Sequence, residues 1–110
     1  MKSGQVNLLD LKPARNLSWE AGQDGRTVLL IPKFRKGLMA KWVQPKLRRP
    51  NFRIKLDENG SFIWDLCNGQ RTVGEIARFM NEKHGADFDP KYERTGKFIT
   101  QMLREKFLVI

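Results

Sequence analysis

The period of hydrophobic and polar positions changes near residue 57. Before it, Leu17 and Trp19 alternate with polar neighbours, residues 22–25 carry a turn signal, and residues 27–31 form a short apolar run rich in β-branched side chains. This pattern predicts a hairpin. Pro32 should end its second strand or confine that strand to an edge of the sheet, because proline has no N–H to donate to a strand ladder.

Residues 52–56 predict a further, half-buried strand, because apolar and basic residues alternate there with a period of two. Phe52, Ile54 and Leu56 should face a core, and Arg53 and Lys55 should face solvent. Residues 40–47 leave two alternatives open. They either form an added strand around Trp42 or are interrupted by the proline at position 45.

From residue 57 onward the pattern has helical periodicity and predicts three helices. Asp57 is a candidate N-cap for the first, which should end at Gly69. Thr72 and Glu75 have the spacing of a capping box that opens the second. The second helix should bury one stripe and end near His84. That stripe comprises Val73, Ile76, Ala77 and Met80.

The third predicted helix begins at Asp89-Pro90, which have N-cap and N1 chemistry, and runs toward Phe107. Its apolar stripe comprises Tyr92, Gly96, Ile99 and Leu103. Phe98 and Met102 lie partly off that stripe. This helix is therefore apolar over a wider arc than one packing surface needs, which indicates a contact beyond the core.

Length and composition predict a single α+β domain over residues 1–110, with strands at about 15–56 and helices at about 57–107. The single cysteine, Cys67, cannot form an intrachain disulfide, and with one histidine, His84, no Cys/His zinc site can be assembled. No apolar run reaches the roughly 20 residues of a membrane span, and the first residues lack the apolar centre of a secretory signal. We expect a cytoplasmic protein without membrane association.

The net charge of +9 belongs to the first half of the chain. Residues 1–56 contain 13 Lys and Arg against 3 Asp and Glu, whereas residues 57–110 contain 8 against 9. Such a basic segment either serves solubility or attracts an anionic partner: nucleic acid, an acidic peptide or a lipid headgroup.

The sequence offers no constellation for catalysis. His84 is the one base available to Cys67 or to Ser3, Ser18 or Ser61, and the pattern places it on no helix face with any of them. No phosphate-binding glycine loop occurs. We therefore predict a protein that is not an enzyme, with no catalytic residues, no metal and no cofactor.

Residues 56–77 carry a dense local motif: Leu-Asp ending a strand, Ile63-Trp64 with Leu66 two further on, a glycine stop, and Arg-Thr-Val-x-Glu-Ile-Ala opening the next helix. This motif resembles the PqqD family, named after pyrroloquinoline quinone biosynthesis protein D. The resemblance covers about residues 52–110 and is weaker over 15–34. The segment 33–51 departs from it, being longer and more basic than the family's usual link into its third strand.

The resemblance implies a winged-helix-like domain: an N-terminal antiparallel three-stranded sheet, with room for an extra hairpin, followed by three α-helices. It also implies a peptide chaperone that binds the leader of a ribosomally made precursor peptide and presents it to a modifying enzyme, often a radical SAM protein. The leader would add as a strand beside the third strand and lie against the third helix. The peptide-binding residues would be Phe52, Arg53, Ile54, Lys55, Leu56, Arg94, Phe98, Gln101, Met102 and Glu105.

Arg53 and Lys55 flank the predicted edge and favour a leader with acidic residues near its apolar anchors. The alternative is a nucleic-acid-binding winged helix that uses the basic half of the chain. Against it, the turn at residues 85–89 is longer than the roughly 3–4 residues of a helix-turn-helix, and the third helix mixes both charges.

Overall fold

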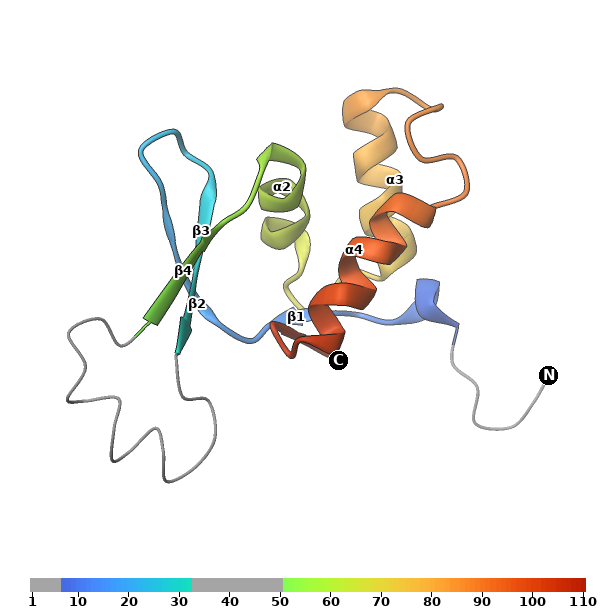
Figure 1. The fold of residues 1–110 in the computed structure, drawn as a ribbon. Helices are drawn as coiled ribbons and strands as arrows, with labels where there is room; N and C mark the ends of the chain where they lie inside the picture. Colours follow the sequence, from blue (N-terminus) through green and yellow to red (C-terminus); the bar gives the residue numbers. More distant parts are fainter. Residues whose placement is uncertain (1–6, 33–50) are drawn as a thin grey trace. The chain divides into compact units, whose positions relative to one another are not determined.

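The computed structural model describes residues 7–32 and 51–110, and it divides the chain into two compact units. One unit comprises residues 17–61 and the other residues 1–16 with 62–110. Figure 1 shows strands in the first unit and helices in the second, and the helix at Glu58–Leu66 begins in the first unit and ends in the second. The predicted order of an antiparallel sheet followed by three helices is confirmed. The single domain and the winged-helix likeness stay predictions.

The sheet of the first unit has the order β2-β3-β4, with β2 at Ser18–Ala21, β3 at Thr27–Pro32 and β4 at Asn51–Lys55. Both pairings are antiparallel. The predicted hairpin is confirmed, with Gly25 at a φ of 83° in its turn. The alternatives for residues 40–47 lie outside the described residues.

The helices are α2 at Glu58–Leu66, α3 at Val73–His84 and α4 at Glu93–Arg104. Asp57 caps α2 through a 2.7 Å bond from the N–H of Gly60 to its Oδ1. Both bonds of the Thr72–Glu75 capping box are present at the start of α3. The stripe predicted for α3 is buried as expected.

Two predicted features of the third helix are wrong. It begins at Glu93 and not at Asp89-Pro90, because residues 89–92 form a turn that ends with Tyr92 in the left-handed region. It also ends before Phe107. Lys106 has a φ of 68°, and the N–H groups of Lys106 and Phe107 return to the carbonyls of Leu103 and Met102, the pattern of a Schellman stop.

The sequence pattern did not predict three short elements in the helical unit. A 3-10 helix, η1, spans Leu8–Asp10, and the two-residue strands β1 (Ala14–Arg15) and β5 (Leu108–Val109) pair antiparallel. Backbone bonds tie residues 11–16 to the helices: the N–H of Val73 donates to Leu11, that of Gly69 to Pro13, and that of Asn16 to Phe107. The N-terminal segment is thus part of the helical unit.

Candidate peptide-binding surfaces

The side of β4 opposite β3 is the first candidate surface. Within the described part of the chain β4 has one neighbour, β3. The N–H of Leu56 donates to the carbonyl of Thr27 at 2.8 Å, which fixes the alternation of ladder bonds between β3 and β4. Ile54 therefore directs its backbone groups toward β3. Arg53 and Lys55 direct theirs to the opposite side, where a further strand would add.

Register places Ile54 beside Leu29 and Trp19 on one face of the sheet. The sequence predicted Ile54 to face a core, and this is wrong: its side chain is 42% exposed, although Leu29 is fully buried and Leu56 is 8% exposed. A period of two distributes side chains between two faces but does not say how far an outer strand is covered. The backbone of Phe52 lies in β4, but the side chain of Phe52 is not among those that the structure describes.

The basic residues of β4 already have carboxylate partners on the hairpin. Arg53 forms an ion pair with Glu20, and the Nζ of Lys55 lies 2.7 Å from Oδ2 of Asp24. The hydrogen bond from Lys55, with one from the N–H of Arg26, holds the pKa of Asp24 below its ordinary value. An acidic guest peptide would have to compete with these pairs. Exposed ion pairs of this kind contribute little to stability because water and salt screen them, so the competition costs little.

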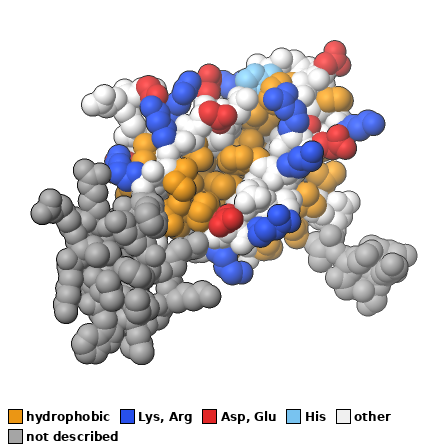
Figure 2. Space-filling model, in the orientation of Figure 1, with side chains coloured by type: hydrophobic (Ala, Val, Ile, Leu, Met, Phe, Trp, Pro, Cys, Tyr) orange, Lys and Arg blue, Asp and Glu red, His pale blue; other side chains and the backbone are white. Residues whose placement is uncertain are grey.

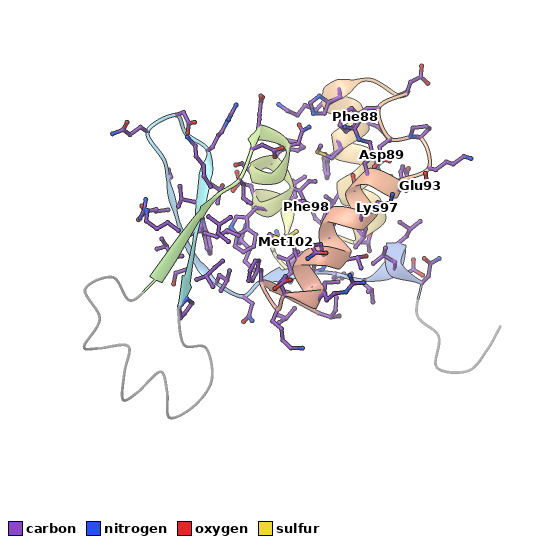
Figure 3. All side chains as sticks on the ribbon, viewed as in Figure 1. Phe88, Asp89, Glu93, Lys97, Phe98 and Met102 are labelled. Atoms are coloured by element: carbon purple, nitrogen blue, oxygen red, sulfur yellow. The ribbon has the colours of Figure 1, made fainter. Side chains whose placement is uncertain are left out.

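The outer arc of α4 is the second candidate surface. Phe98 and Met102 lie on one side of the helix, away from Glu93 and Lys97 (Figure 3). Phe98 is half-buried, whereas Met102 is 6% exposed and belongs to the buried stripe in place of Leu103. The expectation of an exposed Met102 is therefore wrong. Helical spacing alone does not decide whether position 102 or position 103 of α4 belongs to the buried stripe.

The polar residues of this arc contact one another or the loop before α4. Nε2 of Gln101 lies 3.2 Å from Oε2 of Glu105, one turn further along. The guanidinium carbon of Arg94 lies 4.0 Å from the centroid of the Phe88 ring. The Phe88 ring also stacks on the His84 ring, with centroids 4.3 Å apart. On the face drawn in Figure 2, Lys and Arg side chains lie among hydrophobic and acidic ones. The β4 residues and the α4 residues belong to different compact units.

Two of the side chains considered above for catalysis, those of Cys67 and Ser61, are buried or already hydrogen-bonded within the fold. Cys67 is fully buried, and desolvation raises the pKa of its thiol to about 12, so the nucleophilic thiolate does not form near neutral pH. The hydroxyl of Ser61 is engaged by the N–H of Thr27 at 2.8 Å. Among residues 7–32 and 51–110, no group of three His, Cys, Asp or Glu side chains could hold a metal ion.

Comparison with protein families matches residues 49–108, more than half of the chain, to the family described as Coenzyme PQQ synthesis protein D (PqqD). The chain belongs to the PqqD family. Proteins of the PqqD family are generally accessory proteins without catalysis of their own. The match spans β4 and all three α-helices but neither η1 nor the β2-β3 hairpin. Comparisons with curated proteins and with solved structures gave no match.

No helix in the described ranges has the length and apolar character needed to cross a membrane.

Proposed function

We propose that this chain is a non-catalytic peptide chaperone that binds the leader of a ribosomally made precursor peptide by strand addition to β4. It then presents the peptide to a modifying enzyme, such as a radical SAM protein. The observation that carries the proposal is the direction of the backbone groups of Arg53 and Lys55, which point away from β3 on a strand inside the family match. A row of such groups accepts an extended chain through main-chain hydrogen bonds.

The side chains beside this edge suit an amphipathic leader. Ile54 and Trp19 are 42% and 44% exposed, and an apolar anchor that covers such surface adds roughly 1.5–3 kcal/mol when fully buried. Each new backbone hydrogen bond contributes about 0.5–1.5 kcal/mol net. After the cost of association, a dissociation constant of micromolar order is expected.

A proline substitution tests strand addition by removing a single backbone N–H group of β4. Arg53→Pro removes an N–H that points to the guest, and Arg53→Ala is its matched control, because both variants lose the ion pair with Glu20. The ligands are synthetic peptides that together cover the products of the short reading frames adjacent to the gene. Calorimetry measures the dissociation constant of each peptide. We expect Arg53→Ala to bind within a few-fold of the wild type and Arg53→Pro to lose about tenfold or more. Equal affinity of the two variants would contradict strand addition at this position.

The alternative function, nucleic-acid binding, has less support in the described residues. The connection between α3 and α4 spans residues 85–92, well beyond the roughly 3–4 residues of a helix-turn-helix. Arg26, Arg53 and Lys55 are matched by Asp24 and Glu20. Salt dependence separates the two functions: binding to nucleic acid should weaken by about one log-log unit per phosphate contacted, and strand addition much less.

A further inference from the structure

A groove of about 580 Å³ lies between η1 and α4, within the helical unit. Its apolar lining comes from Leu8, Leu9, Tyr92 and Gly96. Lys97, Thr100 and Arg104 of α4 also line the groove. Their spacing of i, i+3 and i+7 places them on one face of the helix. Figure 3 shows Lys97 with Glu93 on this side of α4 and Phe98 with Met102 on the other. The groove shares Gln101 with the arc of α4 described above, and its other α4 residues lie away from Phe98 and Met102.

Two helical glycines, Gly96 and Gly74, lie against η1, and the contact at Gly96 is the tighter one. A Cβ at Gly96 would lie 3.3 Å from Cδ2 of Leu8, and a Cβ at Gly74 would lie 3.4 Å from the carbonyl oxygen of Leu9. Asn7 caps η1 by accepting a 2.9 Å bond from the N–H of Leu9. Because glycine lets the backbone approach closely, η1 packs against helices that define its position. The groove is therefore formed before any partner binds.

The charge of the groove is mainly positive. Lys91, Lys97 and Arg104 line it, against one carboxylate, Glu93. None of the three cations forms an ion pair with another residue in the described ranges. The basic residues of β4 differ in this respect, since both have a carboxylate partner. An occupant of the groove is thus expected to supply the negative charge.

We propose that this groove is a docking site for an acidic segment of a partner protein that also carries one or two apolar anchors. The anchors contact Leu8, Leu9 and Tyr92, and the carboxylates of the segment pair with Lys97 and Arg104. The volume lies within the roughly 300–1,000 Å³ usual for binding clefts. The apolar lining and Glu93 disfavour a nucleic-acid backbone, which is anionic along its whole length. The site goes beyond the proposed function, because it needs no part of β4 and η1 lies outside the family match.

The test uses the full chain labelled with ¹⁵N and a short helical probe peptide with Leu at i and i+4 and Glu elsewhere. Its controls are the same peptide with Lys for Glu and with Ser for Leu. We expect binding of the Leu/Glu peptide alone, with amide shifts centred on Gly96, Lys97 and Thr100. Absence of binding, or shifts centred on another surface, would overturn the proposal. Tighter binding of a DNA duplex at the same amides would replace the proposed partner by nucleic acid.

Charge and shape are tested separately. Lys97→Glu/Arg104→Glu should weaken probe binding about tenfold or more. Arg78→Glu/Lys83→Glu is the matched control, because it makes the same charge change at exposed positions of α3 outside the groove. Thr100→Trp should fill the groove and weaken binding without a change of charge; circular dichroism verifies that it folds. Equal loss in the α3 control would show an unspecific charge effect and refute the site.

Leader binding at β4 should be unchanged in all of these variants. Failure of the groove and failure of strand addition are therefore distinguishable.

Discussion

One carboxylate, Asp89, organises the start of α4. Its Oδ1 and Oδ2 accept bonds from the N–H groups of Arg94 and Thr95 at 3.0 and 2.9 Å. Its own backbone is held by Asn81 of α3, which accepts from its N–H at 2.7 Å and donates to its carbonyl at 2.9 Å. Asp89 therefore caps a helix that begins four positions later and connects it to α3.

Asp89→Ala should lower the free energy of unfolding by about 1–2 kcal/mol, because it leaves the first N–H groups of α4 without their acceptor. Urea unfolding followed by circular dichroism measures the change. The control is Asp87→Ala, an exposed neighbour in the same loop, for which we expect a change within about 0.5 kcal/mol. Equal effects of the two substitutions would contradict this role of Asp89.

The same carboxylate predicts a pH dependence. Burial raises the pKa of Asp89, but the hydrogen bonds from the N–H groups of Thr95 and Arg94 outweigh burial, so the net pKa is below the ordinary 3.8. A carboxyl group of this kind stabilises the fold above its ordinary pKa, and the contribution is lost as pH falls through the lowered value. The stability difference between wild type and Asp89→Asn should therefore shrink below about pH 4. A difference independent of pH would exclude this contribution.

At the scale of elements, the sequence predicted what local chemistry determines. The capping box of α3 and the N-cap Asp57 act within one turn, and the structure has both. The predicted end of α2 at Gly69 is wrong: α2 ends at Leu66, and Gly69 lies in the following turn, where its N–H donates to the carbonyl of Pro13. The late start of α4 escaped prediction because Asp89 reaches its N–H groups from across a turn. The strands β1 and β5 form because they pair with each other, and a contact between such distant segments leaves no periodic pattern in the local sequence.

The candidate site was predictable to the same extent. The position of β4 and its alternation follow from residues 52–56, but the exposure of Ile54 depends on what covers the sheet. The ion pairs of Arg53 and Lys55 depend on the hairpin placing Glu20 and Asp24 opposite them. The signal for η1 was present: a potential cap at Asn7, two leucines, and glycines on two helices where a close approach was possible.

Gly74 tests the packing of η1. A Cβ at this position makes ordinary contact with Leu9, so Gly74→Ala should change stability by less than about 1 kcal/mol. Gly74→Leu extends into η1 and should cost about 1–3 kcal/mol. Chemical denaturation, with the amide signal of Leu9 as a local probe, separates the variants. Equal stability of the Leu and Ala variants would mean that η1 does not need this close approach.

At the scale of the whole molecule, little of the formal charge of +9 belongs to the described sheet. Residues 18–32 and 51–56 contain three Lys and Arg residues against Glu20 and Asp24, a net of +1. Glu20→Gln/Asp24→Asn should release Arg53 and Lys55 and raise the affinity for an acidic leader by about two- to fivefold at low salt. The gain should vanish at high salt. Calorimetry at two salt concentrations measures it, and an unchanged affinity would exclude a role of these cations in recognition.

The central claim is that a guest peptide becomes a strand beside β4. The most direct measurement is an isotope-filtered NOE experiment on the ¹⁵N,¹³C-labelled chain with an unlabelled leader peptide. The account predicts intermolecular NOEs from the backbone protons of the peptide to those of Arg53 and Lys55, with the periodicity of a sheet. A bound peptide whose NOEs avoid these two residues would contradict it.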